Sequence, residues 1–195
     1  MDAISALSGI ASAFGLSGSA GLNAYIPLLI VALAGRFPND DPLLSLAEPY
    51  NVITSWWAIG LLVVLLAVEI TVDKVPAIDS INDVIQTFVR PTAGALLFAA
   101  NADVITDLNP ILALVAGLLL AGGVHATKAV ARPAVTTTTA GTGNWFISLV
   151  EDVVAFFLSV LSVLLPILAL MLLFGLIIGV IWLVRRRRGR ELAYE

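Results

Sequence analysis

The chain has 195 residues, of which 59% are hydrophobic and 12% are charged, and its mean hydropathy is +1.02. A soluble domain averages about 45–50% apolar and about 25% charged residues, so this composition predicts a membrane protein. The absence of cysteine excludes disulfides and thiol catalysis, and the single histidine excludes a multi-histidine metal centre. The net charge of -4 also argues against a nucleic-acid partner.

Segments without charged residues indicate where lipid can surround the chain. The uncharged runs are 3–35, 49–68, 91–102, 108–124 and 153–184. A helix needs about 20 apolar residues to cross the hydrocarbon, and the first and last runs are longer than one crossing requires. Because glycines interrupt the first run and Pro166 interrupts the last, we expect two helical pieces in each.

In chain order, the sequence predicts a short helix, six crossings and one amphipathic segment. The short helix is expected at 3–14 and the amphipathic segment at 80–89, and the crossings are expected near 19–35, 53–72, 91–107, 110–132, 145–164 and 166–184. The predicted fold class is therefore all-α, a polytopic helical membrane protein with about six transmembrane helices plus short amphipathic or re-entrant helices. We expect one membrane domain over 1–184 and a basic cytoplasmic tail over 185–195.

The positions of lysine and arginine predict the orientation in the membrane. Five arginines lie within 185–190, directly after the last predicted crossing, and short cytoplasmic loops carry an excess of basic residues. This pattern predicts a cytoplasmic C-terminus. Six crossings would then place the N-terminus in the cytoplasm as well, and the acidic segment with Asp40, Asp41 and Glu48 on the other side.

Two short motifs recur in the same order and indicate a weak internal repeat. Gly21-Leu22-Asn23-Ala24 resembles Gly123-Val124-His125-Ala126, and the segment 82–88 resembles 151–157. The repeat halves would be 1–108 and 109–184. Chance similarity between apolar segments is the alternative. A duplication would fit transporters, whose sites lie where repeats meet.

Ionisable and polar residues that lie deep in apolar segments form the candidate site. A charge inside a membrane costs at least about 2.5 kcal/mol unless it is paired or hydrated, so we expect Glu69 and these neighbours to face the bundle interior. His125, Lys128 and Arg132 share one helix face, and the stripe at 79, 82, 83 and 86 precedes Arg90. The candidate ion- or substrate-binding residues are Asn23, Asp73, Lys74, Asp79, Asp83, Arg90, His125, Lys128, Glu151 and Asp152.

Three structural explanations compete with a binding role. Ser80 with Asp83, and Ser148 with Glu151, match the capping-box spacing at helix starts. The side chains of Arg90, Lys128 and other basic residues can extend to the lipid headgroups. Buried ion pairs can also do no more than hold helices together.

Five blocks of the sequence together carry a resemblance to a known family. They are Gly21–Tyr25, Asp73–Asp79, Arg90–Ala95, His125–Ala129 with Arg132, and Ser148–Asp152. Over roughly residues 15–180 the chain resembles the small bacterial integral membrane proteins grouped as domain of unknown function 4126. The resemblance implies an integral membrane fold in the bacterial cytoplasmic (inner) membrane and implies no reaction.

The favoured functional hypothesis is a small transporter or channel for an ion or small solute, with the lipid bilayer as its surroundings and no cofactor. A structural or assembly protein with buried ion pairs is one alternative. A metal-dependent intramembrane enzyme, with His125, Glu151 and Asp152 as its acid, base or metal ligands, is the other. The sequence names no substrate and no metal, and it leaves open a homo-oligomer.

Overall fold

The computed structural model describes residues 3–72, 76–101, 109–139 and 142–191, and all regular structure in this part of the chain is helical. Its α-helices are α1 (Ala3–Leu22), α2 (Tyr25–Ala34), α3 (Trp56–Val72), α4 (Pro76–Ala100), α5 (Pro110–Thr139), α6 (Thr142–Leu164) and α7 (Pro166–Glu191), with a 3₁₀ helix at Tyr50–Thr54. The all-α expectation is confirmed. Pro110–Val130 and Gly143–Leu164 are long and apolar enough to span a membrane.

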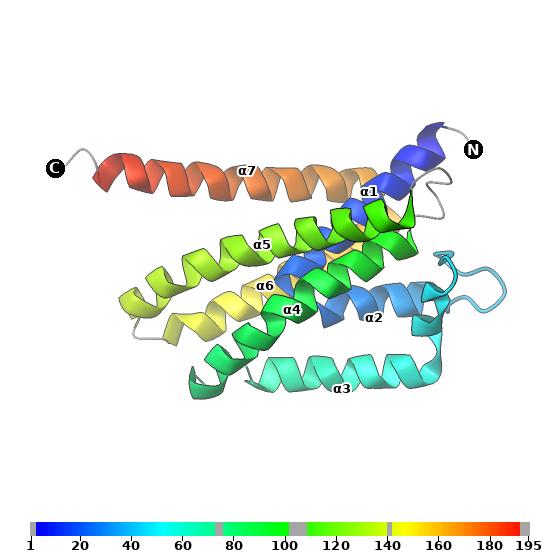
Figure 1. Ribbon diagram of the computed structural model, residues 1–195, viewed down its shortest axis with the longest axis horizontal. Helices are drawn as coiled ribbons and strands as arrows, with labels where there is room; N and C mark the ends of the chain where they lie inside the picture. The colour runs from blue at the N-terminus through cyan, green and yellow to red at the C-terminus, as the bar shows by residue number, and fades with distance from the viewer. Residues whose placement is uncertain (1–2, 73–75, 102–108, 140–141, 192–195) are drawn as a thin grey trace.

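The helices lie along the long axis of the molecule, and α1 runs through their middle (Figure 1). α1 packs against α4, α5, α6 and α7. Its buried residues are mostly small, so neighbouring backbones come within hydrogen-bonding reach. The Ser17 hydroxyl donates to the Gly94 carbonyl at 2.6 Å, and the Ser19 hydroxyl donates to the Ala155 carbonyl at 2.8 Å. These bonds connect α1 to α4 and to α6.

The first uncharged run folds as a helical hairpin. α1 ends at Leu22, the chain reverses at Asn23 and Ala24, and α2 runs back. The Asn23 side-chain oxygen accepts the backbone amides of Tyr25 at 3.0 Å and Ile26 at 3.1 Å, which satisfies donors in the first turn of α2. The two helical pieces expected in this run are confirmed, but their predicted bounds of 3–14 and 19–35 are wrong.

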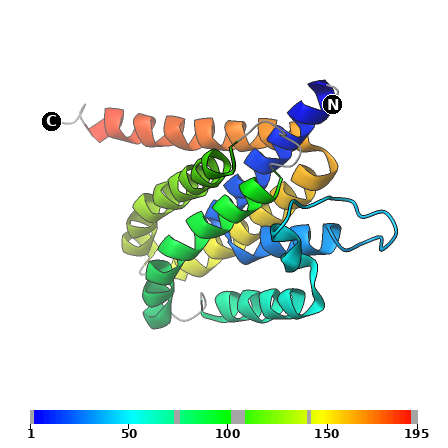
Figure 2. The same ribbon diagram turned by 45° about the vertical axis from the view of Figure 1, so that its right-hand side comes forward.

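The reversal at Asn23 lies inside the bundle. Asn23 and Ala24 are both buried, and α4, α5, α6 and α7 extend past the turn toward the end where the C-terminus lies (Figures 1 and 2). The start of α1 lies at the opposite end of the long axis from the end of α7. A membrane perpendicular to this axis would separate the two ends, whereas the sequence predicts both in the cytoplasm; that placement stays a prediction.

Several predicted boundaries also differ from the structure. The segments 80–89 and 91–107 were expected as separate pieces, but α4 continues through Pro91 to Ala100. Its long contact with α5 holds both halves, although proline removes one helical hydrogen bond. Ser80 and Ser148 lie inside α4 and α6, so neither begins a helix, and the capping explanation is wrong. α7 continues to Glu191, so the arginines of 185–190 extend this helix.

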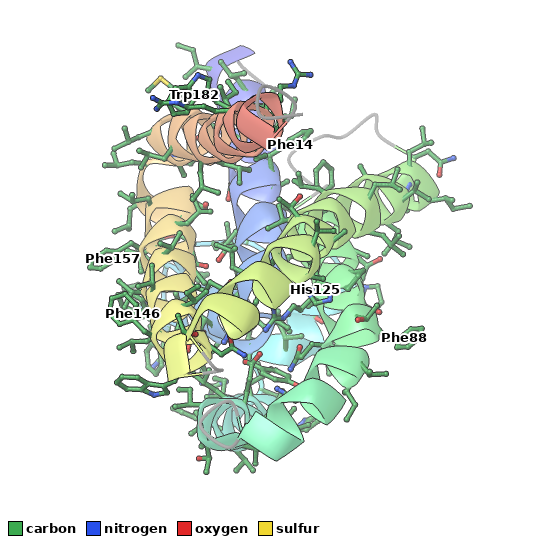
Figure 3. All side chains as sticks on the ribbon, turned by 90° about the vertical axis from the view of Figure 1, so that its left-hand side faces the viewer. Phe14, Phe88, His125, Phe146, Phe157 and Trp182 are labelled. Atoms are coloured by element: carbon green, nitrogen blue, oxygen red, sulfur yellow. The ribbon has the colours of Figure 1, made fainter. Side chains whose placement is uncertain are left out.

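Apolar side chains cover the outside of the bundle, and polar side chains lie within it (Figure 3). Phe88, Phe146 and Phe157 point outward, and Phe88 is 72% exposed. His125 points into the space between helices and is 6% exposed. A protein in water normally shows the opposite distribution, because burial of apolar surface drives its folding.

The close packing of α4 against α5 yields a stability prediction. A methyl group on Gly117 would collide with the Gly94 carbonyl oxygen and lie 2.6 Å from Phe98 Cβ. Gly117→Ala should therefore lower the free energy of unfolding by about 1–3 kcal/mol, measured as a lower thermal midpoint in detergent. Gly60→Ala is the control, because nothing lies within 4 Å of its added methyl. An unchanged midpoint for Gly117→Ala would show that this contact is loose.

Candidate functional site

A buried ion pair joins α3 to α4. Arg90 lies midway along α4, and its Nη2 donates to Glu69 Oε1 of α3 at 3.1 Å. Both side chains are only 2% exposed. Neither charge can reach water by extending outward, so the explanation that Arg90 extends to the headgroups is wrong. The expectation that Glu69 faces the bundle interior is confirmed.

His125 of α5 lies next to this ion pair. Its Nδ1 lies 3.5 Å from Arg90 Nη1, and its Nε2 lies 3.2 Å from the Thr87 hydroxyl. Thr87 precedes Arg90 by three residues, so both reach the imidazole from one side of α4. The only histidine of the chain therefore lies beside the Arg90–Glu69 pair, and a proton on its ring would change the charge there.

Polar groups of α2 and α4 border the same region. The Tyr25 hydroxyl interacts with the Gln86 side chain, and it also interacts electrostatically with Glu69 and Arg90. Gln86 Oε1 and Arg90 Nε are buried, and neither has a hydrogen-bond partner among the described residues. Buried polar atoms of this kind normally bind ordered water or a polar ligand. This region therefore has hydrogen-bonding capacity that the described side chains do not use.

A second set of polar contacts joins α6 to α5 and to the α1–α2 turn. Lys128 Nζ lies 2.5 Å from Glu151 Oε2. The Asn23 amide donates to Asp152 Oδ1 at 2.9 Å. Lys128 is buried, so the headgroup explanation is wrong for this residue too. Because Lys128 follows His125 by three residues, one face of α5 connects both sets of contacts.

We call these residues the polar centre, and it brings together much of the predicted site. It comprises Asn23, Tyr25, Glu69, Gln86, Thr87, Arg90, His125, Lys128, Glu151 and Asp152. Six of the ten predicted site residues belong to it. Asp73 and Lys74 lie outside the described residues, as do the side chains of Asp79, Asp83 and Arg132.

Four members of the polar centre were absent from the predicted binding set. Glu69 was expected to face the bundle interior and Gln86 belonged to the predicted polar stripe, but neither was assigned to binding, and Tyr25 and Thr87 were missed. The available signal for Thr87 was its position one helical turn before Arg90. Tyr25 offered no such signal, because its place depends on the chain reversal at Asn23.

The contacts between the predicted repeat halves are reciprocal. Asn23 of the first half contacts Asp152 of the second, and His125 of the second half contacts Thr87 and Arg90 of the first. The polar centre thus lies where the halves would meet. The duplication itself stays a prediction.

The three residues considered as metal ligands have separate partners. His125 lies against α4, Glu151 against Lys128, and Asp152 against Asn23. In the part of the chain that the structure describes, no three His, Asp or Glu side chains gather as a metal site.

Comparison with known families supplies an identification. The family described as Domain of unknown function (DUF4126) matches residues 10–186. The chain belongs to this family. The match covers most of α1 and all of α2 to α6, and therefore every residue of the polar centre. No curated protein and no solved structure matches the chain.

The Arg90–Glu69 pair yields a second prediction. Arg90→Met alone or Glu69→Leu alone removes the ion-pair partner of a buried charge, and each should lower the free energy of unfolding by about 3–5 kcal/mol. The double variant should recover most of this loss, because neither charge remains. Thermal unfolding of the four proteins in the same detergent measures the coupling. Additive losses in the double variant would contradict a direct pair.

Proposed function

We propose that this DUF4126 protein is a small integral membrane transporter or channel for an ion or small solute, and that the polar centre is its binding site. The observation that carries the proposal is a group of three buried and two half-buried charged side chains inside a helical bundle whose outer surface is apolar. They are Glu69, Arg90, Lys128, Glu151 and Asp152. Ionisable residues at membrane depth are costly and commonly mark ion or substrate pathways.

The apolar outer surface supports a location within a lipid bilayer. Exposed Leu, Val, Ile and aromatic side chains extend along α3 to α7, and a lipid surrounding makes such a surface favourable. We propose that α3, α4, α5, α6 and α7 cross the membrane. α2 has 10 residues, about 15 Å of helix, which is half of the hydrocarbon thickness of about 30 Å.

In this arrangement α1 and α2 form a re-entrant hairpin. It enters from the side opposite the C-terminus, and its tip at Asn23 lies at membrane depth. Non-helical backbone is stable at membrane depth only where it is buried in protein or lines a wet cavity. Asn23 and Ala24 meet this condition, because both are buried. The arginines of 185–190 favour a cytoplasmic C-terminus, so the N-terminus faces the other side of a bacterial inner membrane.

The break between α1 and α2 gives the site fixed partial charges. Transporters place interrupted helices at midplane sites, where helix ends help to bind ions and charged groups. The N-terminus of α2 carries partial positive charge. Asp152 lies near it, because its carboxylate accepts a hydrogen bond from Asn23, which precedes α2. The last carbonyl groups of α1 supply partial negative charge at the same place.

The charge balance of the polar centre favours a proton or cation as part of the transported species. Its described side chains include three carboxylates, on Glu69, Glu151 and Asp152, against the permanent cations of Arg90 and Lys128. Among these five described side chains the negative charges exceed the positive charges by one. A proton on His125 or a bound cation would lie beside these carboxylates, which favours a positively charged species in the polar centre.

One observation favours a structural protein as the second candidate. Glu69 and Glu151 each lie in direct contact with a basic side chain, and Asp152 accepts a hydrogen bond from Asn23. Such contacts would also hold helices in place without any ligand. The free hydrogen-bonding capacity at Gln86 and Arg90 favours the transporter, because a purely structural core would be fully paired.

Flux measurements in proteoliposomes test the proposal. The wild-type protein should move protons or a small ion, screened with pH- and ion-sensitive dyes. Asp152→Asn keeps the size and deletes the charge, so flux should fall by at least about tenfold while helicity by circular dichroism is retained. His125→Gln, which keeps a hydrogen-bonding side chain but removes the protonatable ring, should reduce the pH dependence of flux.

The control for these variants is Asp40→Asn, which deletes an exposed carboxylate outside the polar centre and should leave flux unchanged. Absence of any wild-type flux would count against a transporter. If Lys128→Met also restored the stability lost in Glu151→Gln, whose carboxylate is the partner of Lys128, the structural candidate would replace it.

Cysteine accessibility tests the orientation, because the chain lacks native cysteine. Ile4→Cys and Asp40→Cys should react with an impermeant maleimide from the outside of intact cells. Arg186→Cys should react only after the membrane is opened. All three positions are exposed in the structure. Labelling of Ile4→Cys and Arg186→Cys from the same side would contradict the proposed topology.

A further inference from the structure

A groove that borders the polar centre at Lys128 and Glu151 lies between α5, α6 and α7, with Leu22 of α1 among its lining residues. Its volume is 540 Å³, within the range of about 300–1,000 Å³ that is typical of small-molecule sites. Its walls are apolar over most of their length, with Leu119, Val154 and Ile177 on the three helices. Figure 3 shows these three helices around the end of α1.

The groove has the length of one membrane leaflet. Its lining residues on α5 run from Leu119 to Lys128. At a rise of 1.5 Å per residue this is about 14 Å, close to half of the hydrocarbon thickness of about 30 Å. α5 and α7 run in the same direction, toward the C-terminal end of the bundle (Figure 1). In the proposed membrane arrangement the groove therefore lies in the half of the bundle nearer the end of α7.

Basic side chains lie at that end of the groove. Lys128 lines the groove together with its partner Glu151. Ile181 is the last lining residue of α7, and Arg185 follows it by four residues on the same helix face. Arg185 and Arg186 are both exposed, and Arg186 lies over the Trp182 ring at 5.0 Å. The apolar groove thus ends close to the basic side chains of α7.

We propose that this groove binds one acyl chain of an anionic phospholipid from the cytoplasmic leaflet, with the lipid phosphate at Arg185 and Arg186. Apolar walls of one leaflet's length match an acyl chain, and the arginines match a negative headgroup. The bound lipid covers the side of the Lys128–Glu151 pair that faces the groove. This inference rests on the proposed membrane location and does not require transport.

Gly123 provides a way to fill the groove without disturbing the fold. It lines the groove, and no atom lies within 4 Å of an added Cβ. Gly123→Phe should occupy the space of the acyl chain. Gly60→Phe is the matched control, because Gly60 of α3 is equally open and does not line the groove.

Native mass spectrometry of the detergent-purified full chain, titrated with phosphatidylglycerol or phosphatidylcholine, tests the proposal. The wild type and Gly60→Phe should bind one phosphatidylglycerol in preference to phosphatidylcholine. Gly123→Phe should weaken binding by about tenfold or more, the loss expected when about two buried methylene groups are displaced. Replacing Arg185 and Arg186 by glutamine should weaken phosphatidylglycerol binding by about fivefold per arginine and leave phosphatidylcholine unaffected.

Equal lipid binding by Gly123→Phe and Gly60→Phe would overturn the proposal, and so would an absence of headgroup preference in the wild type. A wild-type dimer that Gly123→Phe dissociates would assign the groove to a second copy of the chain and would also overturn it. If Gly123→Phe fails to fold, lipid binding by the arginine double variant decides the test, because its changes lie on the surface. The readout is lipid binding, so loss of the transport proposal would leave this result interpretable.

Discussion

A charge placed in an apolar bundle needs a partner, and the Arg90–Glu69 pair shows how this chain meets that constraint. The guanidinium and carboxylate are in direct contact and almost fully buried, which fixes α3 against α4. His125 then brings α5 to the same point through Arg90 and Thr87. The cost of leaving any of these groups alone in lipid or protein interior restricts how the helices can be arranged. The polar centre is therefore both a determinant of the fold and the candidate site.

Small residues on α1 make this arrangement sterically accessible. Hydrogen bonds from Ser17 and Ser19 reach backbone carbonyls of α4 and α6 only because the helices approach closely. The same helix ends at Asn23, whose side chain satisfies the start of α2 and contacts Asp152. The central helix thus provides the packing surface of the bundle, and the turn that follows it gives the polar centre one of its side chains.

The Lys128–Glu151 pair connects the two proposed sites. It joins α5 to α6 within the polar centre and also forms part of the wall of the groove beside α7. A lipid in the groove would exclude water from this pair and strengthen its attraction, because a charge pair interacts more strongly at low dielectric. The lipid environment would then influence the polar centre directly.

The sequence alone determined the helical class and the burial of Glu69. It also indicated a group of polar residues inside the bundle, because charges in long apolar segments leave few physical alternatives. This group included Arg90, His125, Lys128, Glu151 and Asp152. The sequence could not locate the reversal at Asn23, since a glycine-rich apolar run is compatible with one crossing or two short helices. It also could not show that α4 passes through Pro91, because contact with α5 outweighs the local preference to break. Partner choice was decided only by the tertiary structure: which acid faces Arg90 or Lys128 depends on how helices distant in sequence pack together.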